Sequence, residues 1–256
     1  GLGNLGSNII ASVNPESRSD GLRGILDNPD NFGPDGTVEC AGYNLIRTNV
    51  NNNKLTDALF AAFDVIYVHY MSNSSFGNED ALKVHNWLKA RKNRVLIASY
   101  DAADVSKYLV NELLGGSSNI QYLVTNNKEF SLAPSSADNN YFTATGPFTT
   151  GTYTPIASDF SFRNYDAYHG EILLNTESAK GITPILIGKA GGIVLGVDYS
   201  RRIVYIGDLD LGNTSSNLES TNNNRINNTS GIINNDASKL IANVFAWITN
   251  TVLYGE

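Results

Sequence analysis

The chain has 256 residues, with 18 basic against 25 acidic side chains and a net charge of −7. Its Lys and Arg residues are scattered rather than clustered, which argues against nucleic-acid binding, because neutralising phosphates needs grouped cations. No segment reaches the ~20 apolar residues that span a bilayer, and no basic amphipathic face suits a membrane surface, so this segment is not expected to insert into membranes. Cys40 is the only cysteine. It excludes an internal disulfide or a thiolate zinc cage, and its apolar surroundings predict a small buried hydrophobe rather than a reactive thiol.

The first half of the chain alternates β-branched apolar runs with segments of helical periodicity, the pattern of βαβ units and a parallel sheet. Asn78 is placed to cap the third helix, with Glu79 and Asp80 in its first turn. The predicted strands cover 8–13, 38–46, 64–70 and 94–99, and the predicted helices cover 20–26, 55–63, 79–92 and 104–114.

The second half begins with a segment rich in Thr, Gly, Phe and Tyr, 141–175, which predicts an irregular or β-rich insertion. Strands are expected at 183–187, 192–199 and 201–209, the last two as an antiparallel hairpin at or near a sheet edge. An Asn-rich loop covers 213–235, and an amphipathic helix covers 236–253. These elements predict a three-layer α/β sandwich with a mainly parallel sheet, formed as one domain over residues 1–256.

Several stretches resemble the class I glutamine amidotransferase-like domain, and in particular its noncatalytic relatives in secreted bacterial proteins. The resemblance implies a flavodoxin-like fold with helices on both faces of the sheet. The stretches are 22–38 (LRGILDNPDNFGPDGTV), 63–70 (FDVIYVHY), 83–101, 192–210 (GIVLGVDYSRRIVYIGDLD) and 242–247 (ANVFAW).

Active members of that family carry a cysteine, flanked by glycines, at a strand-to-helix elbow, and a His-x-Glu pair late in the chain. Here the elbow reads Ala-Ser-Tyr-Asp-Ala over 98–102, and the late strand ends in Gly-Asp-Leu-Asp over 207–210. Carried over position by position, the resemblance leaves neither a nucleophile nor a base. Amidotransferase activity is therefore not expected.

A hydrolase is the competing hypothesis, acting on carbohydrate or ester substrates through Ser99 or Asp101 with His69 or His169. A hydroxyl nucleophile needs an imidazole within hydrogen-bond reach. His69 lies near the end of its strand, and His169 lies in the insertion. No tight glycine turn flanks Ser99, although such turns usually expose a nucleophile.

Carboxylates gather where two predicted strands end, Asp101 and Asp104 after one strand and Asp208 and Asp210 after another. Ligands of open α/β sheets bind at such ends. Asp208, Asp210, Ser216 and Glu219 partly match the spacing of a calcium loop, but Gly212 and Asn213 depart from it. Calcium at Asp208, Asp210 and Glu219 is thus left open, no other cofactor is expected, and these carboxylates could instead bond to nearby backbone amides.

Aromatic side chains crowd the insertion, where they could stack on sugars, anchor a protein partner, or pack the insertion onto its own sheet. The candidate ligand-binding residues at the sheet ends and in the insertion are Tyr70, Tyr100, Asp101, Tyr165, Tyr168, Asp208 and Asp210.

The leading hypothesis is a noncatalytic domain that binds a glycan or a protein at the cell surface. About one residue in eight is Asn while 17% are charged, which favours an extracellular, periplasmic or cell-surface location. The chain begins at Gly1 without a signal peptide, so a processed or truncated chain is expected. A structural module of a surface assembly is the third hypothesis.

Overall fold

The computed structural model describes a set of separate ranges that together carry the sheet and its helices. They are 9–12, 20–46, 56–68, 77–100, 105–115, 120–123, 128–133, 152–153, 156–157, 160–164, 169–173, 180–188, 190–212, 214 and 226–255.

Five parallel strands form one half of the main sheet. In chain order they are β1 (Ile9–Ser12), β4 (Tyr43–Ile46), β5 (Val65–Val68), β6 (Val95–Ser99) and β13 (Ile203–Ile206). In space they run β4-β1-β5-β6-β13. Numbered along the chain, that order is 2-1-3-4-5, which is the flavodoxin-like doubly wound order. The predicted α/β fold class is confirmed.

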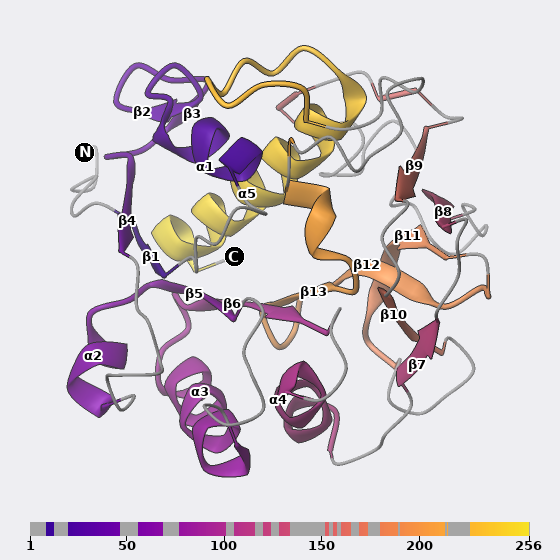
Figure 1. Cartoon of the computed structure of the whole chain (residues 1–256). Coiled ribbons are helices and arrows are strands. Elements are labelled where there is room, and N and C mark those ends of the chain that lie inside the picture. The colour runs from indigo at the N-terminus through magenta and orange to yellow at the C-terminus, as the bar shows by residue number, and fades with distance from the viewer. Residues whose placement is uncertain are drawn as a thin grey trace.

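Helices cover both faces of this half, so the molecule has three layers (Figure 1). On one face lie α1 (Asp20–Asp27) and α5 (Asp236–Tyr254). On the other lie α2 (Asp57–Ala61), α3 (Asn78–Ala90) and α4 (Val105–Leu113). This division follows from right-handed crossovers, because the chain moves in one direction from β1 to β4 and in the opposite direction afterwards.

The other half of the sheet is antiparallel. β13 pairs with β12 (Ile193–Asp198), followed by β11 (Thr183–Ile187), β8 (Lys128–Leu132) and β9 (Ser161–Asn164). Branching from this path, β10 (His169–Ile172) pairs with β12 and with β7 (Ile120–Leu123). The hairpin of β12 and β13 therefore lies inside the sheet. Its prediction at an edge was wrong because β8 and β9 extend the sheet beyond β11.

Two local predictions also need correction. The strand expected at 38–46 is interrupted: β3 (Val38–Glu39) pairs with β2 (Phe32–Gly33), and β4 starts only at Tyr43. Gly42 lies between them at φ +91°, a conformation that glycine adopts without strain. The N-cap of α3 is Gly77 rather than Asn78, and the Gly77 amide donates to the Asp80 carboxylate at 3.1 Å.

Each face of the sheet has its own hydrophobic core, because successive side chains of a strand point to opposite faces. Val95 and Ile97 of β6 belong to the core under α1 and α5, whereas Leu96 and Ala98 belong to the core over α2, α3 and α4. Cys40 is buried in the first core, as predicted. Within the described ranges, no helix is both long enough and apolar enough to cross a membrane. The expectation of a single domain stays a prediction.

Candidate functional site at the carboxyl ends of the strands

Ligands of doubly wound sheets bind beyond the carboxyl ends of the strands, where the strand order reverses. That reversal lies between β1 and β5. The residues that follow these two strands, 13–19 and 69–76, lie outside the described ranges, and so do His69 and Tyr70. The described part of the edge is formed by the ends of β6 and β13, with Ser99, Tyr100 and Asp208.

Tyr100 occupies the elbow after β6 and is fully buried. Its hydroxyl donates to the Ile193 carbonyl oxygen at 2.7 Å, and its amide donates to the Ile206 carbonyl oxygen at 3.0 Å. The ring packs in the core over α2, α3 and α4. Tyr100 therefore offers no exposed surface to a ligand in this structure.

Two glycines allow the Tyr100 ring and the β10 backbone to meet. A Cβ at Gly170 would lie 2.5 Å from Tyr100 Cδ2, and one at Gly207 would lie 2.7 Å from Tyr100 Cε2, which are closer than real Cβ contacts. The Gly170 amide donates to the Gly207 carbonyl oxygen at 2.9 Å. β10 thus lies across the ends of β6 and β13 and covers the elbow.

Ser99, the candidate nucleophile, is also fully buried. Alternation along β6 directs its side chain toward the α1 and α5 face, opposite to Tyr100. Ser99 Oγ has no hydrogen-bond partner among the described residues. The described geometry therefore contains no base on this hydroxyl.

His169 and Glu171 form a buried pair on β10. His169 Nε2 lies 2.9 Å from Glu171 Oε1, and Glu171 Oε2 accepts from the Gly192 amide at 2.8 Å. A carboxylate can only accept, so the proton of the first bond is on Nε2. The other ring nitrogen, Nδ1, is buried without a partner in the described part of the chain. Since neither it nor Ser99 Oγ has a partner, the two are not hydrogen-bonded to each other.

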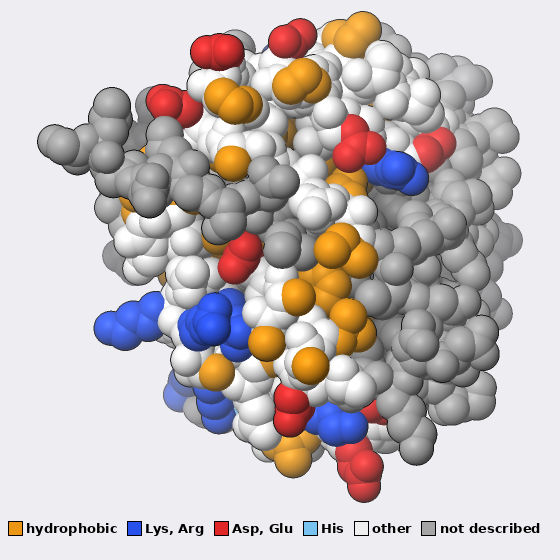
Figure 2. Space-filling model, turned by 90° about the vertical axis from the view of Figure 1, so that its left-hand side faces the viewer, with side chains coloured by type: hydrophobic (Ala, Val, Ile, Leu, Met, Phe, Trp, Pro, Cys, Tyr) orange, Lys and Arg blue, Asp and Glu red, His pale blue; other side chains and the backbone are white. Residues whose placement is uncertain are grey.

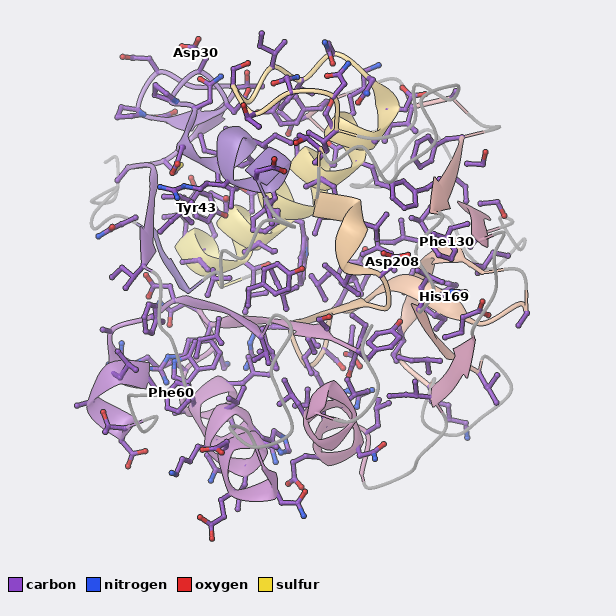
Figure 3. All side chains as sticks on the ribbon, in the orientation of Figure 1. Asp30, Tyr43, Phe60, Phe130, His169 and Asp208 are labelled. Atoms are coloured by element: carbon purple, nitrogen blue, oxygen red, sulfur yellow. The ribbon has the colours of Figure 1, made fainter. Side chains whose placement is uncertain are left out.

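The surroundings of this pair are apolar and tightly packed. The His169 ring meets the Phe130 ring edge to face, with centroids 4.9 Å apart. Gly188 and Gly192 leave the space that the Glu171 carboxylate fills. Figure 3 labels His169, Phe130 and Asp208 in one part of the molecule, where β12 begins. His169 is thus an oriented imidazole held inside the fold.

Sequence reasoning named His169 but missed Glu171. A signal was present, because two residues at i and i+2 on a strand point to the same face. The His-x-Glu spacing therefore occurs in this chain at 169–171, on β10, rather than after β13 where the family resemblance had directed the search.

Asp208 is buried at the end of β13, and its carbonyl oxygen accepts from the Leu211 amide at 3.4 Å. Asp210 follows within the 3-10 helix η3 (Leu209–Gly212), but its side chain lies outside the described part. Among the described residues, no three His, Cys, Asp or Glu side chains group closely enough to hold a metal ion. The calcium prediction stays untested, since Glu219 also lies outside the described ranges.

The remaining candidates, Asp101, Tyr165 and Tyr168, lie outside the described ranges as well. Cys40 lies elsewhere in the fold, and burial raises the pKa of its thiol. A thiolate nucleophile is therefore not favoured at Cys40.

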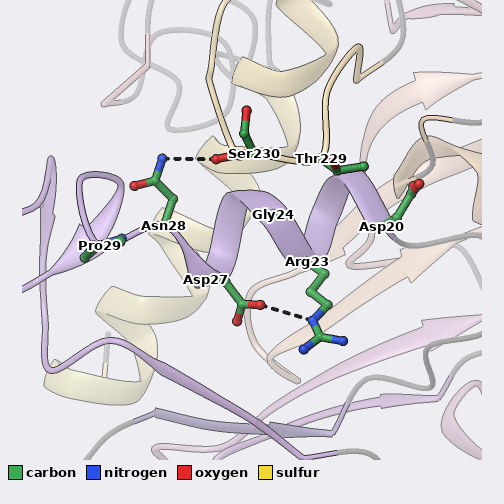
Figure 4. A pocket seen from close by; sticks show the side chains of 8 residues that line it. All are labelled: Asp20, Arg23, Gly24, Asp27, Asn28, Pro29, Thr229 and Ser230. Carbon is green, nitrogen blue, oxygen red and sulfur yellow. Dashed lines mark hydrogen bonds and ion pairs between the residues drawn. The ribbon is translucent and has the colours of Figure 1, made fainter.

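A polar hollow of about 500 Å³ lies along α1 (Figure 4). Asn28 Nδ2 donates across it to the Ser230 carbonyl oxygen at 3.4 Å, and Arg23 pairs with Asp27 at 3.1 Å. Both members of the ion pair are largely exposed (Figure 2 shows one face of the molecule with its charged side chains). The hollow therefore offers charged and amide groups to solvent beside α1.

The strand order and the two helix layers define this chain as a doubly wound α/β sandwich. No family model and no curated protein matches the sequence. One similar solved structure, from Thermoplasma acidophilum, is named as a candidate GMP synthase component; it is 8% identical, with a TM-score of 0.48, and the match covers 94% of each chain. Another is a glutamine amidotransferase from Thermotoga maritima, 10% identical, with a TM-score of 0.42, covering 77% of this chain and 73% of that one.

Proposed function

We propose that this chain is a noncatalytic binding domain of a secreted or cell-surface bacterial protein. It holds a glycan or protein ligand at the rim formed by the carboxyl ends of the strands and by the segment 141–175. The observation that carries the proposal is the elbow after β6: Tyr100 is buried there and bonds to Ile193, and β10 covers it. An elbow filled in this way supports packing rather than chemistry.

Binding at the rim is tested with an array of neutral and acidic oligosaccharides. The wild-type chain is expected to retain a subset of these sugars, and the double variant Y165A/Y168A is expected to lose them. Tyr254 is the matched control, because it is an exposed aromatic at the end of α5, so Y254A should bind as the wild type does. Unchanged binding by a folded Y165A/Y168A variant would contradict the proposal.

A hydrolase is the second candidate, and the His169–Glu171 pair favours it. A base oriented by a carboxylate is a recurring part of nucleophilic sites, and His169 Nδ1 has no partner among the described residues. The test is turnover of p-nitrophenyl esters and glycosides by the wild type and by S99A, D101A and H169A. Turnover that S99A and D101A both retain would exclude those two residues as the nucleophile.

A further inference from the structure

A second site candidate lies at the opposite edge of the sheet, where β5 and β6 begin. There a pocket of about 310 Å³ opens between α2 and α3. Phe60 and Trp87 supply much of its apolar lining, Asp57 and Lys83 lie at it, and Arg94 completes it. Figure 3 labels Phe60 beside α2, below the sheet. This pocket is independent of the rim discussed above.

Arg94 is the unusual residue of this pocket, because it is a cation that is only 5% exposed. Its guanidinium carbon lies 5.1 Å from the centre of the Trp87 ring, and Nη1 donates to the Trp87 carbonyl oxygen at 2.8 Å. Its buried Nε has no partner among the described residues. Within that part of the chain, the guanidinium forms no ion pair with a carboxylate at 4.0 Å or less.

The charges near the pocket leave this cation incompletely balanced. Burial lowers the pKa of Arg94, and the neighbouring charge of Arg91 lowers it further, while Asp64 acts in the opposite direction. Lys83 adds a second cation, held loosely to Asp80 at 3.9 Å. A buried charge without a close counter-ion is costly, so an anion that entered the pocket would gain electrostatic free energy.

Capping of α3 explains only part of this arrangement. Arg94 and Arg202 both donate to the last carbonyl groups of α3, Arg94 to Trp87 and Arg202 to Leu88 at 3.0 Å. The Trp87 cap uses one of the five N–H donors of the Arg94 guanidinium. Unlike Arg94, Arg202 does not line the pocket. The two arginines therefore separate the structural role from a binding role.

We propose that the pocket between α2 and α3 binds a carboxylate joined to an apolar carbon skeleton, with Arg94 as the principal anion donor. A guanidinium matches a carboxylate through its planar fork of N–H groups. The aromatic lining of Phe60 and Trp87 suits the carbon skeleton. A monoanion fits better than a dianion, because Lys83 is already paired and the Asp57 carboxylate lies at the pocket.

The test is a titration of the full chain with sodium benzoate, sodium acetate and inorganic phosphate, with NaCl at equal ionic strength. The readouts are the thermal midpoint and the indole N–H resonances of the two tryptophans. Benzoate is expected to bind more tightly than acetate or phosphate, and to shift the Trp87 resonance. Trp247 is the internal reference, since it packs on Tyr199 on the α5 side of the sheet.

Variants then separate the site from the fold. R94Q should bind benzoate about tenfold or more weakly, the loss of one charge-assisted hydrogen bond, while R202Q should bind as the wild type does. D57N should bind more tightly, because it removes a repelling carboxylate. If R94Q does not fold, R94K replaces it and should still bind more weakly, since it keeps the charge but loses the fork.

Three results would overturn the proposal. One is benzoate binding that is equal in the wild type and in R94Q, or in R94K if that variant is the one that folds. The second is phosphate binding tighter than benzoate binding at the Trp87 resonance, which would exclude a carboxylate monoanion. The third is a wild-type chain in which none of the anions moves Trp87 beyond the NaCl control.

Discussion

Glu171 shows at the scale of one residue how a carboxylate is held inside this fold. Both of its oxygens are engaged, one by His169 and one by the Gly192 amide. Its exposure is 0%, so neither partner can turn to water if the carboxylate is removed. The residue is therefore a structural requirement for β10 whatever the function of the rim.

We expect E171A to lower the free energy of unfolding by about 3–5 kcal/mol, because it leaves a buried imidazole and a buried amide without their acceptor. Chemical denaturation followed by circular dichroism measures the change. The control is E112A, which removes a partner of His85 at 3.6 Å in a partly exposed pair and should cost about 1 kcal/mol or less. Equal losses in the two variants would contradict the role assigned to Glu171.

Cys40 should react slowly with thiol reagents in the native chain, because its side chain is buried and burial raises the pKa of the thiol. Labelling with Ellman's reagent at pH 8 is expected to be far slower than in guanidinium chloride, where one thiol per chain should appear. Rapid labelling of the folded chain would show that the thiol is accessible. As Cys40 is the only cysteine, the signal has a single source.

His85 should make stability depend on pH. Burial lowers its pKa most strongly, Lys89 and Arg201 lower it further, and Glu112 opposes them. The unfolded chain therefore holds this proton more tightly, so stability falls as the pH drops below the unfolded pKa of about 6.5 toward the lower folded pKa. Denaturation of the wild type and H85Q between pH 5 and 8 tests this: the wild type should lose more stability toward pH 5, and parallel curves would refute it.

At the scale of elements, β10 is held by the close approach of backbone and ring at Gly170. Adding a methyl group there forces it into the Tyr100 ring and toward the Tyr100 carbonyl oxygen. We expect G170A to destabilise the chain by about 1–3 kcal/mol through overpacking. The comparison variant is G77A, because a Cβ at Gly77 meets nothing within 4 Å. A G170A variant as stable as G77A would show that β10 does not press on Tyr100.

The elements that the sequence predicted best are those with a long, uninterrupted hydrophobic pattern. The last helix was expected at 236–253 and forms at Asp236–Tyr254, and the strand at 183–187 was located at its observed bounds. β7 and β8 were missed because they are short strands whose partners, β10 and β9, come later in the chain. Such pairing depends on tertiary contacts rather than on local propensity.

The site was less predictable than the fold for the same reason. Ser99 and Asp208 were located at strand ends by counting along the chain, and they do lie there. That β10 would cross those ends could not be read from residues 169–172 alone, because it depends on Gly170 meeting Tyr100 and Gly207. The partner of His169 could have been found from its spacing to Glu171.

At the scale of the whole molecule, charge governs solubility. The net charge is −7 near neutral pH and the pI is about 5.0. Self-association should therefore be greatest near pH 5, where repulsion between copies vanishes. Light scattering of the folded chain from pH 4 to pH 8 measures this. A flat profile would indicate that the polar, weakly charged surface keeps the chain soluble without net charge.

The position of β13 has a consequence for synthesis on the ribosome. β6 pairs with β5 as soon as both have emerged, but Leu96 finds its other neighbour only when Ile203 follows. Until then the nascent chain carries an apolar strand with one open edge, a template for association with other chains. Stalling of translation between these two strands would be more hazardous to this protein than stalling at its end.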